Sequence, residues 1–395
     1  MEELKTYRLA DICNSIQTGP FGSQLHKSDY VEFGTPIVMP KDITNGKIND
    51  NNISRISKND VARLFKHKLV PGNIIYPRRG DISKCALITS KEDGWVCGTG
   101  CIKVDINQQI ANSTYVMYVL CQSETVNWIE SNAVGTTMLN LNTSILSDLP
   151  IKLPSLNTQK KLANIVSSFD KKIALNRRIN DNLEQQAQLL FDNLIDASDW
   201  SMTQSLSELS EINPPRKLSK GENAPFIEMS NMPTSGSFPA RIDFKEYNGG
   251  MKFRNGDTIM ARITPCLENG KAAYVNFLQG NEIGFGSTEY IVLAPKKTIS
   301  SSFLYFLVRN KEFVDYAVKH MNGSSGRQRV SGDTIGNYQL PILDRKKLSI
   351  FIAIADRTLT IIKQNSFEIL NLVKQRDTLL PKLMSGELKI NDLNC

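Results

Sequence analysis

Two stretches of the sequence decide the fold: residues 162–194, LANIVSSFDKKIALNRRINDNLEQQAQLLFDNL, and residues 348–380, LSIFIAIADRTLTIIKQNSFEILNLVKQRDTLL. In both, apolar residues recur at steps of three and four, which is typical of an amphipathic helix. The seam positions of the second stretch keep one constant offset of 186 residues, as Leu348 does from Leu162. From Leu162 to Leu194 such a helix spans about 48 Å. Because so narrow an apolar stripe cannot bury itself alone, we expect the two helices to pack as an antiparallel coiled coil.

Three polar residues interrupt this seam: Asn176, Asn180 and Arg376. They either fix the pairing register or lie where the seam opens to solvent. An amphipathic helix inside one ordinary bundle domain is the alternative interpretation of the same spacing. The apolar positions that best mark the two helices are Leu162, Phe169, Ile173, Leu183, Leu348, Leu359, Ile369 and Leu380.

The segments before the helices also repeat. A turn, a β-branched strand and basic residues in 71–79, PGNIIYPRR, match 255–262, NGDTIMAR, and each helix follows a Leu-Pro pair. These repeats predict an α+β fold with two mixed α/β domains, joined by two long antiparallel coiled-coil helices in a pseudo-twofold arrangement. The expected boundaries are residues 1–152 for the first domain, 153–200 for the central helix, 201–339 for the second domain and 340–395 for the C-terminal helix.

Composition narrows the class of protein. The chain has 395 residues, 41% of them hydrophobic, and a formal net charge of +7, a balance that permits nucleic acid as a partner. Its longest apolar run, Tyr115 to Cys121, is far shorter than the roughly 18 residues of a membrane span. An N-terminus without an apolar signal core favours a cytoplasmic protein with reduced thiols. With only three histidines and scattered cysteines, we expect no metal site.

Enzyme motifs are mostly missing from the sequence. It contains no phosphate-binding loop of the Gly-x-x-x-x-Gly-Lys type, no His-Glu-x-x-His and no Gly-x-Ser-x-Gly. The tetrapeptide Asn213-Pro214-Pro215-Arg216 is similar to the base-binding motif of adenine methyltransferases, in which an aromatic residue follows the prolines and stacks on the flipped base. Arg216 cannot close that stack in the same way, and a rigid turn is the alternative interpretation.

Basic and small residues in the loops are better candidates for function. Gly19 to Ser23 form a tight, small-residue loop, and small residues let backbone N–H groups approach a phosphate. Arginine and glutamine side chains suit guanine and adenine edges, and their clusters recur at matching places in both repeats. The predicted DNA-binding residues are Gly19, Pro20, Phe21, Gly22, Ser23, Lys41, Arg78, Arg79, Lys84, Thr136, Thr137, Arg216, Arg262, Lys271, Arg327, Gln328 and Arg329.

Taken together, these features resemble the specificity subunit of type I restriction–modification systems. The most characteristic stretch is 376–388, RDTLLPKLMSGEL, followed by 19–23, GPFGS, by 213–216, NPPR, and by the two Leu-Pro helix starts. The resemblance covers nearly the whole chain, in the order domain, helix, domain, helix. One departure is that the first helix ends in 191–195, FDNLI, without a Leu-Pro-Lys-Leu ending, so the two partner surfaces need not be equivalent.

The resemblance implies a chain that reads double-stranded DNA and carries no catalytic residue or cofactor of its own. It implies docking through the two helices to two modification subunits, which bind S-adenosylmethionine and methylate adenine, and to ATP- and Mg-dependent restriction subunits. Because the two domains share a framework but differ in their loops, we expect an asymmetric, bipartite target with a gap of fixed length. The alternatives are a stand-alone DNA adenine methyltransferase that uses Asn213 to Arg216, and a coiled-coil adaptor that never touches DNA.

Overall fold

The computed structural model describes residues 4–44, 46–135, 139–324, 326–385 and 387. The chain divides into two compact units, residues 1–171 with 373–395, and residues 172–372. Each unit combines one globular part with one half of each long helix. We call the globular parts, residues 4–153 and 203–341, the first and the second domain.

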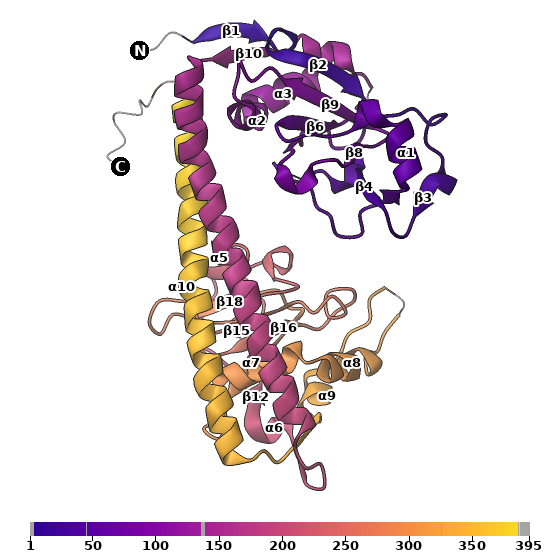
Figure 1. Cartoon of the computed structure of the whole chain (residues 1–395). Helices are drawn as coiled ribbons and strands as arrows, with labels where there is room; N and C mark the ends of the chain where they lie inside the picture. Colours follow the sequence, from indigo (N-terminus) through magenta and orange to yellow (C-terminus); the bar gives the residue numbers. More distant parts are fainter. Residues whose placement is uncertain (1–3, 45, 136–138, 325, 386, 388–395) are drawn as a thin grey trace. The chain divides into compact units, whose positions relative to one another are not determined.

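The two long helices are α5 (Leu156–Asp196) and α10 (Arg345–Met384). They run side by side in opposite directions (Figure 1). In the first unit Leu162 of α5 and Leu383 of α10 belong to the same buried cluster, and in the second unit the rings of Phe191 and Phe351 are 5.5 Å apart. The predicted antiparallel helix pair is therefore confirmed.

The polar residues in the seam are paired across it. Asn176 Nδ2 donates to Glu368 Oε2 at 2.7 Å, and Asn180 Nδ2 donates to Ser366 Oγ at 3.3 Å. Arg376 forms an ion pair of 2.7 Å with Asp170. These contacts fit the interpretation in which polar seam positions fix the register. Asn180 and Ser366 are also counterparts in the repeat, so a position and its own counterpart meet in this helix pair.

The seam residues that were predicted from the sequence pack against other parts of the same chain. Leu162, Ile173 and Leu359 are buried, and the other five are partly buried. Several large apolar side chains on the same helices remain exposed, most of all Leu175, Leu189 and Ile350, at 53%, 63% and 62%. The seam residues themselves are thus directed inward, and a surface for partner subunits has to be built from other positions of the helices.

Among the described residues of the first domain, three sheets are formed. β1 pairs with β10, and two four-stranded sheets have the orders β2-β9-β6-β7 and β3-β5-β4-β8. In the second of these, β4 and β8 are parallel. The strands are β1 (Lys5–Arg8), β2 (Cys13–Thr18), β3 (Tyr30–Val31), β4 (Thr35–Val38), β5 (Arg55–Ile56), β6 (Asn73–Pro77), β7 (Ala86–Leu87), β8 (Val96–Cys97), β9 (Cys101–Ile106) and β10 (Pro150–Leu153).

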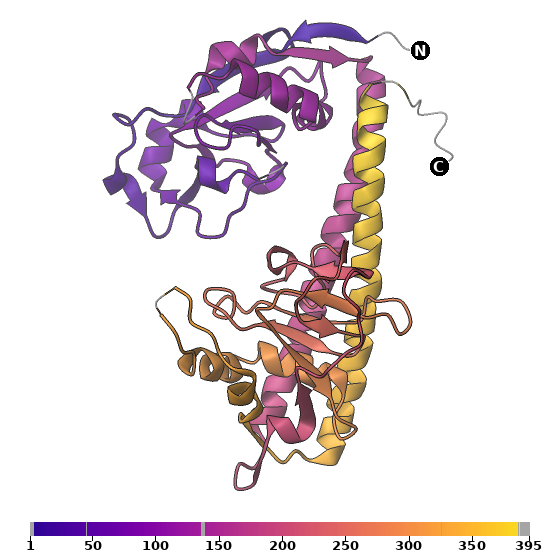
Figure 2. The ribbon, with the colours of Figure 1, turned by 180° about the vertical axis from the view of Figure 1, so that it is seen from behind.

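Figure 2 shows the chain from behind. The second domain repeats this plan except for one edge strand, because β3 flanks β5 in the first domain, whereas β15 flanks β18 in the second. β11 pairs with β20, and the four-stranded sheets have the orders β12-β19-β16-β17 and β14-β13-β18-β15, again with one parallel pair, β13 with β18. The strands are β11 (Thr203–Ser205), β12 (Ser210–Ile212), β13 (Asn223–Ile227), β14 (Asp243–Glu246), β15 (Lys252–Phe253), β16 (Thr258–Ala261), β17 (Ala272–Tyr274), β18 (Gly284–Gly286), β19 (Tyr290–Pro295) and β20 (Gln339–Pro341).

Short helices complete each domain, and α2, α3 and α4 of the first domain match α7, α8 and α9 of the second in their order along the chain. Asparagine N-caps α2, α4 and α8, and serine N-caps α1, α7 and α9, by accepting a backbone N–H of the first turn. The helices are α1 (Lys58–Arg63), α2 (Ser113–Leu120), α3 (Ser123–Asn132), α4 (Thr143–Ser147), α6 (Leu206–Leu209), α7 (Ser301–Arg309), α8 (Lys311–Lys319) and α9 (Gly332–Gly336).

The long helices supply part of each domain's core. In the first unit Leu162, Ala163 and Val166 join Ile74, Val104 and other residues of the sheets and short helices in one buried cluster. In the second unit Phe191 is fully buried, with its ring 5.1 Å from that of Phe303. α5 and α10 lie within the predicted segments 153–200 and 340–395, and each helix half packs as an integral part of one domain's core.

Replacing Phe191 by Ala tests this role of α5. We expect a loss of about 3–5 kcal/mol in the free energy of unfolding of the second unit, because a fully buried ring would leave a cavity. Urea unfolding followed by near-ultraviolet circular dichroism measures it. The neighbouring Leu190, 42% exposed, is the matched control, and its Ala variant should stay within about 0.5 kcal/mol of wild type. Equal effects of the two variants would contradict the assignment.

Candidate nucleic-acid interface

Four loop segments of the first domain meet where β6 ends. The N–H of Arg78, the first residue after β6, donates to the carbonyl of Gly100 at 2.6 Å, and the Arg78 carbonyl accepts from Leu141 N–H at 2.8 Å. Arg79 forms a β-bridge with Asn140. Gly19 N–H donates to the carbonyl of Cys101 at 2.8 Å. We call this meeting point of residues 19–23, 78–84, 98–101 and 139–141 the first loop cluster.

The second domain has the same arrangement at the end of β16. Arg262 N–H donates to the carbonyl of Glu289 at 3.0 Å, and its carbonyl accepts from Val330 N–H at 3.0 Å. Ile263 forms a β-bridge with Arg329, and Thr264 N–H donates to the carbonyl of Gln328 at 3.1 Å. This second loop cluster comprises residues 262–264, 286–289 and 327–330. The structure therefore brings together loops that the sequence paired only by their repeat.

Close packing of backbones holds the first loop cluster. A Cβ atom on Gly19 would lie 2.0 Å from the carbonyl oxygen of Gly98, and one on Gly98 would lie 2.5 Å from the carbonyl oxygen of Val38. No larger side chain fits at either position. Gly19 and Pro20 are buried for this reason, whereas Phe21 is 59% exposed and Gly22 and Ser23 are also exposed. The part of the predicted loop that can meet a ligand is therefore Phe21 to Ser23.

Several predicted DNA-binding side chains are exposed, and others have partners within the chain. Lys41, Arg79 and Arg327 are exposed, and Gln328 is partly buried. Lys84 pairs with Asp81 at 2.6 Å, and Lys271 Nζ donates to the carbonyl of Met229 at 2.7 Å. Lys271 is thus directed toward a loop of its own domain. The predicted residues Thr136 and Thr137 lie outside the described residues.

Arg329 is held by a carboxylate that the sequence did not identify. Its guanidinium makes a bidentate contact with Glu289, with Nη2 to Oε1 at 2.7 Å and Nε to Oε2 at 2.9 Å. The hydrogen bonds from Arg329 lower the pKa of Glu289, with a smaller contribution from the charge of Arg262. Because the Arg329 side chain stays 39% exposed, Glu289 orients this cation at the surface of the second loop cluster.

The structure corrects the interpretation of Asn213 to Arg216. Arg216 Nη2 pairs with Asp257 at 2.5 and 2.7 Å, and the two side chains are only 7% and 1% exposed. Burial raises the pKa of Asp257, against the opposing effect of Arg216. Arg216 therefore lies in the interior, contrary to its prediction as a DNA contact.

Asn213 is also used by the fold. It adopts a positive φ of 53°, its N–H donates to the Val292 carbonyl at 2.7 Å, and its Oδ1 accepts from Val292 N–H at 2.9 Å. The amide oxygen that a methyltransferase would offer to adenine is already bonded to the neighbouring strand. The tetrapeptide is therefore a rigid turn, the alternative that the sequence left open.

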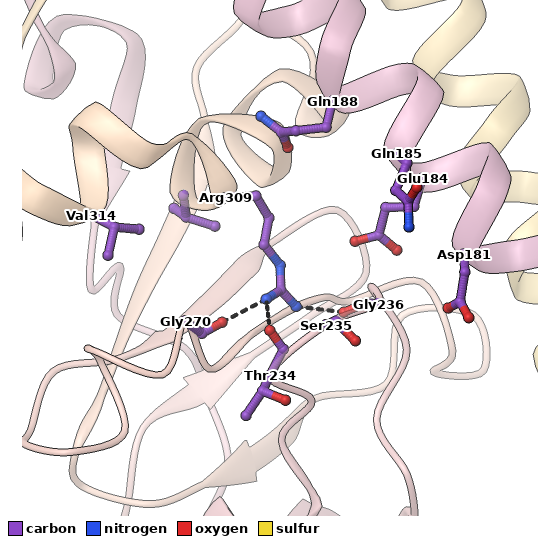
Figure 3. A pocket seen from close by; sticks show the side chains of 11 residues that line it. Asp181, Glu184, Gln185, Gln188, Thr234, Ser235, Gly236, Gly270, Arg309 and Val314 are labelled. Atoms are coloured by element: carbon purple, nitrogen blue, oxygen red, sulfur yellow. Dashed lines mark hydrogen bonds between the residues drawn. The ribbon is translucent and has the colours of Figure 1, made fainter. Parts of the chain in front are cut away.

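An open pocket of about 410 Å³ in the second unit is lined by residues of α5, α7, α8 and two loops (Figure 3). The guanidinium of Arg309 reaches across it and donates to the carbonyls of Thr234 at 2.8 Å and Gly270 at 2.6 Å. Glu184 accepts a hydrogen bond from Tyr305, and burial raises the pKa of Glu184. Arg309 thus fastens the two loops to α7. This role could not be predicted from the sequence, because the loop atoms that accept from Arg309 are backbone carbonyls.

The described part of the chain has neither a cluster of potential metal ligands nor a helix suited to a membrane. Among those residues, no three or more His, Cys, Asp or Glu side chains come together as potential ligands of a metal ion. Within the same residues, no helix has the length and apolar character needed to cross a membrane. Cys85 and Cys121, which the sequence did not pair, have their sulfur atoms 3.5 Å apart.

Comparison with known proteins identifies similar chains. The family model described as type I restriction modification DNA specificity domain matches residues 1–185 and 197–371. The EcoAI specificity subunit of Escherichia coli is 33% identical over 36% of this chain and 25% of its own length, so this match spans about a quarter of that relative. The MjaIX specificity subunit of Methanocaldococcus jannaschii is 25% identical over 91% of this chain and 88% of its own length.

The fold also has a solved counterpart. A crystal structure of the S subunit of a type I restriction–modification system from M. genitalium matches 97% of this chain and 96% of its own chain, with a TM-score of 0.64 and 17% identity. At this identity the likeness concerns the fold alone. It agrees with the α+β architecture of two domains and two long helices described above.

Replacing Arg216 by Met tests its structural role. Removing the arginine leaves Asp257 buried without its ion-pair partner, which typically costs about 3–5 kcal/mol, so we expect a large loss of stability of the second unit in urea unfolding. The exposed neighbour Lys217 is the control, and its Met variant should unfold like wild type. If Arg216→Met unfolds like Lys217→Met but changes DNA binding by the purified protein, the predicted DNA contact is restored.

Proposed function

Because the chain belongs to the type I restriction–modification DNA specificity family, we propose that it is the DNA sequence-recognition subunit of a type I restriction–modification complex. In this role it selects the target sequence on double-stranded DNA and leaves the chemistry to other subunits. The observation that carries the proposal is the pair of loop clusters. Each lies at the end of an inner strand of a four-stranded sheet, β6 or β16, and each bears exposed basic side chains.

The two loop clusters share their backbone plan and differ in their side chains. Arg79 and Asn140 form the bridge in the first cluster, whereas Ile263 and Arg329 form it in the second. In the second cluster a carboxylate, Glu289, orients Arg329, and the described residues of the first cluster contain no such pair with an arginine. Since base readout depends on the donors and acceptors presented to the groove, unlike loops favour unlike base sequences. The target of such a chain is an asymmetric, bipartite sequence with two different half-sites.

Partner subunits are part of this proposal. Two modification subunits, which bind S-adenosylmethionine and methylate adenine, and restriction subunits that use ATP and Mg would complete the complex. Exposed apolar side chains on the helices, such as Leu175, Leu189 and Ile350, offer the surface for docking that the buried seam does not. The chain itself would bind none of these cofactors and would act inside the cell, in the cytoplasm.

A stand-alone adenine methyltransferase is the weaker candidate. Its base pocket would use Asn213 to Arg216, but Asn213 Oδ1 bonds to Val292 and Arg216 pairs with buried Asp257. A coiled-coil adaptor without DNA binding is disfavoured by the two loop clusters, which have no role in pairing the helices. Both alternatives would be recognised by the experiment that follows.

Mapping methylated adenines in a host with and without this chain tests the proposed function. We expect methylation that depends on the chain, at one asymmetric sequence made of two unlike half-sites and an unspecified gap of constant length. The purified chain alone should transfer no methyl group to DNA, whereas the complex with modification subunits should. Methylation by the chain alone would support the enzyme alternative. A continuous or palindromic sequence, or no chain-dependent methylation in a host with intact modification subunits, would contradict the proposal.

A further inference from the structure

Arg78 and Arg262 occupy the same place in the two domains. Each is the first residue after an inner strand of a four-stranded sheet, β6 or β16. The N–H of each donates to a carbonyl of the loop that precedes the neighbouring strand of the sheet, Gly100 before β9 or Glu289 before β19. The carbonyl of each accepts from a residue of a third segment, Leu141 or Val330. The backbone of each arginine is therefore fixed on both sides in the same way.

The side chains of these two arginines share a second property. In each, the Nε atom is buried and has no hydrogen-bond partner among the residues that the structure describes; the Nε atom of Arg216 is also without a partner, but Nη2 of that residue pairs with Asp257. Neither guanidinium forms an ion pair within those residues, whereas Arg216, Arg329 and Lys84 of the same predicted set all do. Both arginines are thus placed to meet an acceptor from outside the chain.

The surroundings of the two arginines differ. Residue 79 is an arginine and its counterpart at 263 is an isoleucine, while the bridge partner is Asn140 in one cluster and Arg329 in the other. Because this arginine is present in both loop clusters although their other residues differ, we expect it to contact a part of the DNA that both half-sites share. The phosphate backbone is common to every DNA sequence, and contacts to it position a protein without carrying sequence information. The planar guanidinium matches the geometry of a phosphate oxygen pair.

We propose that Arg78 and Arg262 are equivalent phosphate anchors, one in each domain. They would set the position of each loop cluster on the duplex, and the residues that differ between the clusters would read the bases. This inference rests on the proposed function, since it assigns a role within DNA recognition.

The test uses the complete complex of the chain with its modification subunits, with Arg78→Gln, Arg262→Gln and the double variant. Binding to a duplex with the mapped target and to an unrelated duplex is measured over a range of salt concentrations. Each single variant should weaken binding to both duplexes by the same factor, roughly tenfold to a hundredfold for a lost charge-assisted hydrogen bond. The slope of log K against log salt should fall by about one for each lost phosphate contact. The methylated sequence should stay the same.

Controls separate this role from loss of charge or loss of fold. Lys152→Gln and Lys297→Gln each remove one exposed positive charge away from the loop clusters; Lys152 lies in β10, and Lys297 follows the opposite end of β19 from residues 286–289. Both should bind like wild type. Arg78→Lys and Arg262→Lys keep the charge, and they should keep the salt slope while losing part of the affinity.

Each other outcome overturns the proposal in a recognisable way. A relaxed preference at one base position would mean that the arginine reads a base. Glutamine variants that bind like Lys297→Gln, at every salt concentration, would mean that the arginines only support the loops. In both cases the wild-type complex still prefers its mapped target, and the proposed function stands. If the wild-type complex shows no preference for that target, the proposed function fails with the inference.

Discussion

The antiparallel packing of α5 against α10 is the interaction on which the rest of the structure depends. Each helix carries a narrow apolar stripe that would be exposed to water without its partner. The pair also completes the globular cores: Leu162 and Leu383 close the core of the first unit, and Phe191 and Phe351 close that of the second. A domain in this chain is therefore a sheet assembly together with two helix halves, and the helices do more than connect the domains.

Register is the requirement that this packing imposes on the sequence. Asn176 bonds to Glu368, Asn180 bonds to Ser366 and Arg376 pairs with Asp170, so polar groups meet polar groups at every interruption of the seam. A shift by one residue would place these side chains against apolar neighbours and leave them without partners. This requirement explains why the seam positions of the two helices keep a constant offset of 186 residues, whereas the spacing of the loops varies.

The repeated elements could be predicted from the sequence, but the ion pairs between residues far apart in the chain could not. The helices, the domain order and the matched loops follow from periodicity and internal similarity, and the structure confirms the strand-end positions of Arg78 and Arg262. Which basic side chains are free could not be predicted, because Arg216 finds Asp257 and Arg329 finds Glu289 about forty residues away in the chain. Strands of two residues, such as β3 and β8, carry too little pattern to predict, and they form only because neighbouring segments supply their partners.

The central claim is that the two domains share one framework and that the loop cluster of each recognises its own DNA half-site independently. Its most direct test replaces residues 201–339 by the corresponding segment of a relative that has a different methylation target, and then maps methylated adenines in the same host. The account predicts that one half-site changes to that of the relative, while the other half-site and the dependence on the modification subunits remain. A change in both half-sites, or in neither, from a chimera that still assembles and methylates DNA would contradict it.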